Sequence, residues 1–180
     1  MKVQAIKQLP PDIQVLVSES QPEGYRFLKR LVDDYRNETN LFDQHGEVLI
    51  SVRDDNTLVA IGGINNHDGV ARLRRFYVSK AHRRSGVGRL LLEALESHAA
   101  LFFSEVLLFT DTTEASRFYE ACGYIAVSEN KVSHRKVFTK DNKALGSRIH
   151  KTVIAINGSI DLDLPPRSMP RSCTNLLKMD

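Results

Sequence analysis

The sequence predicts an α/β protein in which helices flank a mixed, mostly antiparallel central sheet. Three observations support this fold class. Short apolar runs separated by polar turns indicate neighbouring strands, apolar residues three and four positions apart indicate helices, and the two kinds of segment alternate along the chain. The chain has 180 residues, of which 42% are hydrophobic and 26% charged, values typical of a globular protein and unlike those of a disordered one.

The expected elements extend to about residue 140. The spacing from Ser20 to Glu23 is that of a capping box, and it predicts that the first amphipathic helix begins there and continues through Tyr35. A later short helix ends at Gly123, a suitable C-terminal cap. The expected strands are 47–53, 57–64, 71–78, 105–110, 124–127 and 132–140, and the later helices are 87–102 and 115–122.

We expect one domain in residues 1–140 and a C-terminal extension in residues 141–180, because the helical and alternating patterns fade there and prolines interrupt the chain. The strand-like piece of the extension is 152–156. Two interpretations stay open. The extension is a disordered tail, or it is an exchanged arm whose strand pairs with a sheet edge of a second copy in a homodimer.

Composition argues against several function classes. The net charge of +3 is too small to indicate a nucleic-acid partner, and no apolar run or leader-like N-terminus indicates a membrane partner, so we expect a cytoplasmic protein. Cys122 and Cys173 form no zinc-binding or disulfide pattern, so we expect no metal and two reduced thiols. Cys122 lies on an apolar helix face, which is typical of a buried hydrophobe.

The most informative stretch is 72–91, which is predicted to form a strand, a basic turn and a helix. Gly86 and Gly88 let a ligand approach the backbone, and the free N–H groups of the following helical turn favour an anion. The stretch is rich in arginine and contains no acidic residue. Arg89 and Leu91 exclude a Walker loop and a Rossmann fingerprint, respectively. The turn is therefore predicted to bind a multiply phosphorylated ligand.

Two segments carry a family resemblance. Arg83-Arg84-Ser85-Gly86-Val87-Gly88 resembles the Arg/Gln-x-x-Gly-x-Gly/Ala signature of the GNAT N-acetyltransferase superfamily. Residues 115–124 are similar to that family's Ala-x-x-Phe-Tyr-x-x-x-Gly-Phe segment. The resemblance covers residues 28–140. It implies a GNAT-like sheet with a V-shaped splay between the fourth and fifth strands, which here are 71–78 and 105–110.

The resemblance also implies a site. Acetyl-CoA would be the acetyl donor, with its pyrophosphate on the glycine turn and its pantetheine arm along the predicted strand 71–78. Tyr119 matches the family's tyrosine, and its neutral phenol would protonate the departing sulfur. The cofactor-binding residues implied in this way are Phe76, Tyr77, Val78, Arg83, Arg84, Ser85, Gly86, Val87, Gly88, Arg89, Thr112, Ala115 and Phe118.

The chain departs from the family pattern in two places. Arg72 stands where many relatives carry a glutamate base, and an arginine cannot accept a proton. Thr112 stands where relatives often have an asparagine that binds the cofactor arm; a threonine can cap the helix instead. An ordered water, a partly neutral substrate amine or another side chain would then remove the proton. The candidate side chains are Glu47, His67, Asp68 and His134.

The function implied is N-acetyltransfer from acetyl-CoA to a primary amine of a small molecule or a protein, by direct attack. Alternation places Arg72 and Arg74 on one face of their strand and Arg75 on the other, which suggests an acceptor that carries a carboxylate. Solvated surface arginines, or contacts to CoA phosphates, explain the same pattern. Two other classes stay open: a catalytically silent acyl-CoA-binding sensor and, less favoured, a nucleic-acid-binding domain.

Overall fold

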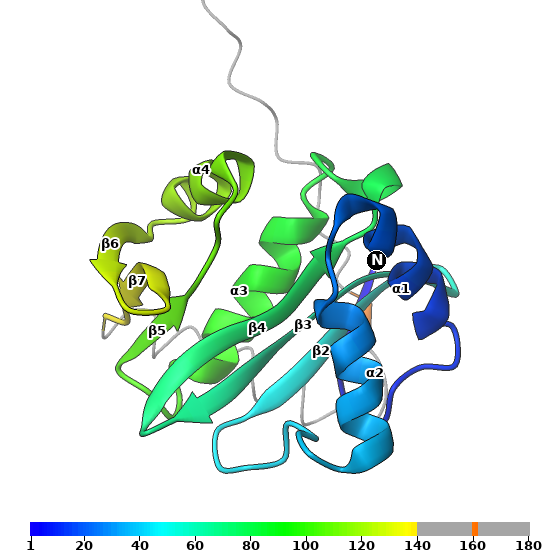
Figure 1. The fold of residues 1–180 in the computed structure, drawn as a ribbon, viewed down its shortest axis with the longest axis horizontal. Coiled ribbons are helices and arrows are strands. Elements are labelled where there is room, and N and C mark those ends of the chain that lie inside the picture. The colour runs from blue at the N-terminus through cyan, green and yellow to red at the C-terminus, as the bar shows by residue number, and fades with distance from the viewer. Residues whose placement is uncertain (140–159, 162–180) are drawn as a thin grey trace, which may run out of the picture.

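The computed structural model describes residues 1–139 and 160–161, and within them one sheet runs in the order β6-β7-β5-β4-β3-β2-β1-β8 (Figure 1). Its strands are β1 (Lys2–Ile6), β2 (Val48–Asp54), β3 (Thr57–His67), β4 (Val70–Val78), β5 (Glu105–Leu108), β6 (Ile125–Glu129), β7 (Val132–Val137) and β8 (Ile160–Asp161). The helices are α1 (Ile13–Ser20), α2 (Phe27–Asn37), α3 (Val87–Ala99) and α4 (Thr113–Ala121), with short 3₁₀ turns η1 (Gln21–Glu23) and η2 (Lys80–His82).

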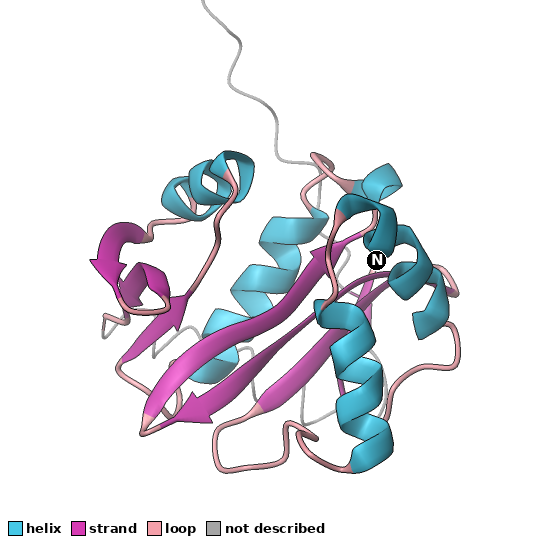
Figure 2. Cartoon of the chain, viewed as in Figure 1, coloured by secondary structure: helices cyan, strands magenta, loops and turns pink. Residues whose placement is uncertain are grey.

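The sheet carries a hydrophobic core on each face. Helix α3 packs on one face, where Leu91 and Leu95 are fully buried beside the inward side chains of β2, β3 and β4. Helices α1 and α2 cover the other face (Figure 2). Their residues Leu16, Leu28 and Leu31 are also fully buried. Two-sided coverage explains why β2 and β3 are apolar at consecutive positions instead of alternating.

Strands β4 and β5 are parallel and part almost as soon as they meet. Their register contains only the pairs Ala71↔Val106 and Arg72↔Leu107, although β4 continues to Val78. All other described strand pairs are antiparallel. The predicted fold class is therefore confirmed, with the splay between the fourth and fifth strands.

A β-bulge bends β4 along this splay. The register of β3 and β4 shifts between Ile61 and Gly63, and Arg75 adopts a left-handed backbone with φ +57°. An extra residue on one strand increases its local twist and bends it. The bulge therefore turns the second half of β4 away from β5 and leaves that strand's outer edge, residues 73–78, unpaired by β5.

The N-terminal part differs from the sequence-based expectation. Ser20 does not cap the first amphipathic helix; it is the last residue of α1, and its hydroxyl donates to the Val17 carbonyl at 2.9 Å. The chain then turns through η1 to Gly24, and α2 begins at Phe27 without a side-chain cap. The serine–glutamate spacing fits a helix start, but Pro22 at the beginning of a 3₁₀ turn uses the same residues. Strand β1 and helix α1 were not predicted.

Other bounds shift slightly. The β3–β4 hairpin turns at Asp68 and Gly69, both with positive φ, so β3 extends to His67. Helix α3 ends at Ala99, and β5 ends at Leu108. The strand-like piece 152–156 lies outside the described residues, and the division at residue 141 stays a prediction. Residues 160–161 form the short strand β8, which pairs with β1 at the sheet edge. In the described part of the chain, no helix is long and apolar enough to cross a membrane.

Candidate active site

The glycine turn presents unpaired backbone donors at the start of α3. Gly86 has φ +93° and Arg84 has φ +62°, so the chain makes a sharp left-handed approach to the helix. The Leu90 N–H donates to the Gly86 carbonyl at 3.0 Å and closes the first helical turn, and no side chain caps the helix. The N–H groups of residues 87–89 therefore have no intrahelical acceptor. Since a Cβ built on Gly86 meets nothing within 4 Å, this backbone is open to a ligand.

Arg83 holds the turn in place from inside the protein. Its two terminal nitrogens donate to the two Glu23 carboxylate oxygens at 2.7 and 2.9 Å, and Nε donates to the Val78 carbonyl at 3.1 Å. Its guanidinium also lies 5.4 Å from the centre of the Tyr77 ring. The guanidinium is thus engaged with the fold and fixes the turn that follows it, and a contact of Arg83 with a cofactor stays a prediction.

The N-terminal helices anchor the same end of β4. The Tyr77 hydroxyl lies 2.6 Å from a Glu23 oxygen and 3.0 Å from a Glu19 oxygen, which share its single hydrogen, and the Lys80 N–H donates to Glu19 at 2.6 Å. Burial and these two carboxylates raise the pKa of Tyr77 well above its usual range. Arg83 lowers the pKa of Glu23. Sequence reasoning missed Glu19 and Glu23 because they lie about sixty residues from their partners.

Arg84, Ser85 and Arg89 are exposed, whereas Val87, at the start of α3, is buried in the core. Arg84 is 89% exposed and lies 3.8 Å from Glu114 at the start of α4. Arg89 is exposed, with Nη2 3.5 Å from the Ala121 carbonyl at the end of α4. The Ser85 hydroxyl donates to the His82 carbonyl at 2.6 Å and stabilises the turn. The two arginines therefore bring positive charge to the region between α3 and α4.

An aromatic cluster lies where α4 faces β4. The ring centre of Phe76 is 6.0 Å from those of Phe118 and Tyr119. A Cβ on Gly88 would lie 3.5 Å from Phe118 and 3.6 Å from Val78, in ordinary contact. The structure thus brings the start of α3, the end of β4 and the middle of α4 together, as the two sequence motifs predicted in combination.

Tyr119 is 7% exposed, and burial raises the pKa of its phenol above the usual value of 10.0. Its ring also packs against Tyr124 and His134, with ring centres 5.5 and 6.2 Å away. A buried phenol with a raised pKa is neutral throughout the physiological range, so Tyr119 can donate a hydrogen bond or a proton.

Thr112 caps α4. Its backbone is extended, and its hydroxyl accepts the Ala115 N–H at 3.3 Å. The hydroxyl of Thr110 lies 3.5 Å from that of Thr112. Since the Thr112 side chain is used for capping, its contribution to cofactor binding stays a prediction, as does that of the half-buried Ala115.

His134 is buried in a closed hydrogen-bond network and is 3% exposed. Its Nδ1 lies 2.8 Å from the Ser133 hydroxyl and its Nε2 lies 3.0 Å from the Ser116 hydroxyl. Ser116 in turn donates to Glu120 at 2.9 Å. A neutral ring that carries its proton on Nε2 satisfies both contacts. Both nitrogens are therefore occupied, which disfavours His134 as a base for a substrate amine.

The other base candidates lie on the α2 face of the sheet. Glu47 binds the backbone, because its carboxylate accepts the Gln44 N–H at 3.2 Å and the Asn66 N–H at 2.8 Å. His67 and Asp68 lie at the β3–β4 turn with side chains 66% and 95% exposed. None of them is held at the β4–β5 splay. Arg72, which stands at the position of the family's glutamate, reaches across the splay, since its Nη1 donates to the Lys131 carbonyl at 3.0 Å.

Cys122 is a free, half-buried thiol, and burial is the main cause that raises its pKa. This agrees with a packing role, because a thiol with a raised pKa is a poor nucleophile at neutral pH. Cys173 lies outside the described residues. Among residues 1–139 and 160–161, no three metal-ligating side chains gather as a metal site would require.

The splayed sheet, the glycine turn and the aromatic cluster together place this structure in the GNAT class of α/β proteins. The sequence model of the acetyltransferase (GNAT) family matches residues 13–124, and the chain belongs to this family.

Three relatives illustrate the similarity. The uncharacterized N-acetyltransferase YjcF of Bacillus subtilis (strain 168) is 33% identical over 100 residues, which span 56% of this chain and 66% of that protein. The crystal structure of a protein from Exiguobacterium sp. 255-15, named as an acetyltransferase, has a TM-score of 0.69 and 26% identity and covers 79% of this chain and 95% of its own. The PaiA N-acetyltransferase of Thermoplasma acidophilum, solved in complex with coenzyme A, has a TM-score of 0.57 and 18% identity, with 77% and 100% coverage.

Proposed function

We propose that this protein transfers an acetyl group from acetyl-CoA to a primary amine of a small molecule or a protein. One observation carries the proposal. The unpaired edge of β4, residues 73–78, ends beside the free N–H groups of residues 87–89 at the start of α3. An amide-bearing arm can pair with such an edge as an added strand would, and a pyrophosphate can rest on the helix N-terminus.

The side chains fit a reaction by direct attack. Acetyl-CoA supplies an activated thioester. The neutral amine nitrogen forms the new bond to the carbonyl carbon, and the carbon–sulfur bond breaks with its electron pair on the sulfur, which leaves as a thiolate. The nitrogen then gives up its extra proton to solvent, and the group that protonates the sulfur regains a proton from solvent, so that an acetamide and the free CoA thiol are the products. We assign protonation of the leaving sulfur to Tyr119, because its phenol is neutral and its ring lies beside Phe76 in the aromatic cluster.

None of the four candidate bases, Glu47, His67, Asp68 and His134, offers an acceptor atom that is both free and held at the splay. Arg72 occupies the position of the family's glutamate, Glu47 serves the backbone, and both nitrogens of His134 are occupied. We therefore propose that the acceptor amine loses its proton to solvent before it attacks. The fraction of neutral amine then limits the rate below the amine's own pKa.

Two measurements test the proposal. Calorimetry should detect saturable acetyl-CoA binding by the full chain, and a thiol-release screen over small amines and peptides should then find turnover. Binding without thiol release across the panel would favour the alternative, a silent acyl-CoA sensor. Failure to bind acetyl-CoA would overturn both readings.

A further inference from the structure

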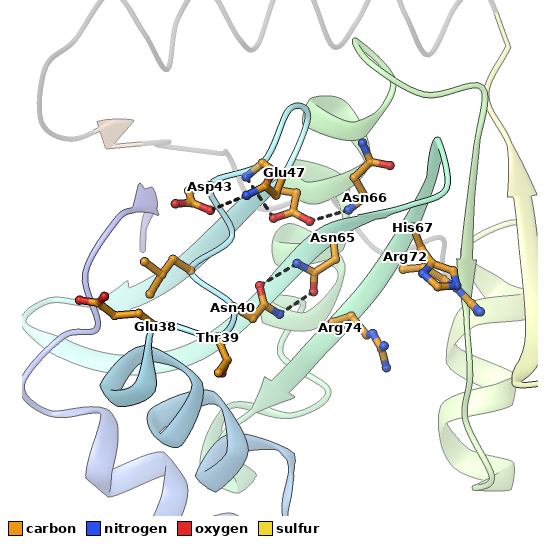
Figure 3. Close-up of a pocket in the computed structure, with 12 residues that line it drawn as sticks. Glu38, Thr39, Asn40, Asp43, Glu47, Asn65, Asn66, His67, Arg72 and Arg74 are labelled. Carbon is orange, nitrogen blue, oxygen red and sulfur yellow. Dashed lines mark hydrogen bonds between the residues drawn. The ribbon is translucent and has the colours of Figure 1, made fainter.

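A polar pocket opens on the α2 face of the sheet, next to the splay. It has a volume of about 430 Å³ and lies between the loop after α2, the end of β3 and the first half of β4 (Figure 3). This size is typical of sites for small molecules. Its lining residues are Glu38, Thr39, Asn40, Leu41, Asp43, Gln44, Glu47, Asn65, Asn66, His67, Arg72 and Arg74.

The pocket floor is built from a reciprocal amide pair. Asn40 Nδ2 donates to Asn65 Oδ1 at 3.1 Å, and Asn65 Nδ2 donates to Asn40 Oδ1 at 3.0 Å (Figure 3). Each amide nitrogen has a second N–H that this pair does not use. Two further contacts fix the surrounding loop. The Tyr35 hydroxyl donates to the Leu41 carbonyl at 3.1 Å, and the Glu47 carboxylate accepts two backbone N–H groups, as described above. The floor is therefore a preorganised set of donors.

The two ends of the pocket carry opposite charge. Arg72 and Arg74 lie at one end, and Glu38 and Asp43 lie at the other (Figure 3). The arginine end is the one that borders the splay, because both side chains come from β4 just before the bulge at Arg75.

Arg74 is exposed and forms no ion pair with a described residue, so its positive charge is only partly offset, by the nearby Asp34. Within the described part of the chain, no carboxylate lies within ion-pair distance of Arg74. The neighbouring acid Asp34 is already used, since its two oxygens accept from Arg75 at 2.6 Å and from Thr39 at 3.1 Å. Partial burial and the nearby Arg75, Arg72 and Arg30 lower the pKa of Arg74. Like charges held this close favour the binding of an anion.

We propose that this pocket holds the acceptor, and that the acceptor is a small amine that also carries an oxyanion, either a carboxylate or a phosphate. One terminal nitrogen of Arg72 donates to the Lys131 carbonyl, and the other N–H groups of its guanidinium are the donors that join Arg74 in binding the oxyanion. This contact directs the amine toward the splay. The remainder of the molecule lies over Asn40 and Asn65. The acidic far end disfavours a second anion there. This inference rests on the proposed function, which it narrows from any primary amine to this class.

The test uses binding, so that it does not depend on turnover. The full-length ¹⁵N-labelled protein is titrated with L-amino acids, with the corresponding primary amides, and with aminoalkyl phosphates, with and without CoA. We expect amino acids, aminoalkyl phosphates or both to shift the side-chain amide signals of Asn40 and Asn65, and the amino-acid amides to leave them in place. The two oxyanion arms distinguish a carboxylate from a phosphate.

Matched variants complete the test. Arg74→Gln should raise the Kd of the responding ligand about 10- to 100-fold, the usual range for a charged hydrogen bond, and should leave CoA affinity unchanged. Arg36→Gln removes the same charge from a 73% exposed arginine of α2 and should have little effect on either ligand. The inference is overturned if no oxyanion-bearing amine moves the signals, if the amides bind as well, or if both variants weaken binding equally. Loss of CoA binding alone would contradict the proposed function, whereas the pocket is still tested in the CoA-free titration.

Discussion

Glu23 and Arg83 form a bidentate ion pair that joins the N-terminal helices to the turn before α3. The two nitrogen–oxygen distances are 2.7 and 2.9 Å, and the Glu23 side chain is only 16% exposed. Because Glu23 also accepts the Tyr77 hydroxyl, one carboxylate fixes both the end of β4 and the turn. A residue of the N-terminal segment thus fixes the geometry of a turn that lies sixty positions further along the chain.

Glu23→Gln should destabilise the protein by about 1–3 kcal/mol at pH 7, the usual value of a charged hydrogen bond. Arg83 and the Tyr77 hydroxyl depress the folded-state pKa of Glu23 below its unfolded value of 4.5, so its contribution is complete above that value and is lost as the pH falls through the folded pKa. Urea unfolding of both proteins at several pH values measures this. A difference that grew in acid would contradict it.

Gly86→Asp should weaken CoA binding at least about tenfold, because it places a carboxylate where the α3 donors favour an anion. Gly69→Asp is the matched control. Gly69 has φ +82° and, like Gly86, open space around a built Cβ, but it lies at the β3–β4 turn. Both variants should lose similar stability, of roughly 1 kcal/mol, from the left-handed backbone. Calorimetry with CoA separates them, and equal loss of affinity would exclude the turn as the phosphate site.

Tyr119→Phe should lower kcat about 100-fold or more while leaving CoA affinity and Tm close to those of the original chain, since only the hydroxyl is removed. Burial raises the pKa of this phenol, so Tyr119 should produce no alkaline decline in activity below about pH 10. Steady-state thiol release across pH measures both effects. Unchanged kcat would limit Tyr119 to a packing role.

His134→Leu should cost about 1–3 kcal/mol of stability, because Ser116 and Ser133 would lose a buried hydrogen-bond partner. If both ring nitrogens are structural, kcat of the folded variant should not show the roughly 100-fold loss that follows removal of a general base. Thermal unfolding and thiol release are compared on the same preparations. A large kcat loss with unchanged Tm would make His134 the base.

The pH dependence of turnover should follow the acceptor. If the amine loses its proton to solvent, log kcat/KM should rise with pH and level off near the pKa of whichever amine is used. Two amines of different pKa should therefore give limbs displaced by that difference. Limbs that coincide would indicate a titrating group of the enzyme and would contradict proton loss to solvent.

Much of the fold could be predicted because its signals are local. Apolar periodicity located the strands from β2 to β7 and helix α3, polar turn residues located the hairpins, and Gly86 and Gly88 located the turn before α3. The same local reasoning failed at Ser20, where one spacing is compatible with a helix start and with a 3₁₀ turn, and only packing of α1 on the sheet distinguishes them. Strand β1 was missed because a short, partly exposed strand has little periodicity of its own.

The sequence by itself determined the order of elements from α2 to β7, the glycine turn before α3 and the Phe-Tyr segment of α4, since each depends on residues that are close together in the chain. Only the tertiary structure decided what those residues do. In the folded protein, Arg83 forms an ion pair with Glu23, and both ring nitrogens of His134 bind serine hydroxyls. Arg74 has no carboxylate within ion-pair distance in the described part of the chain. Glu23 lies sixty residues from Arg83 and Ser116 lies eighteen from His134, so these contacts depend on distances that are set by the packing of helices on the sheet.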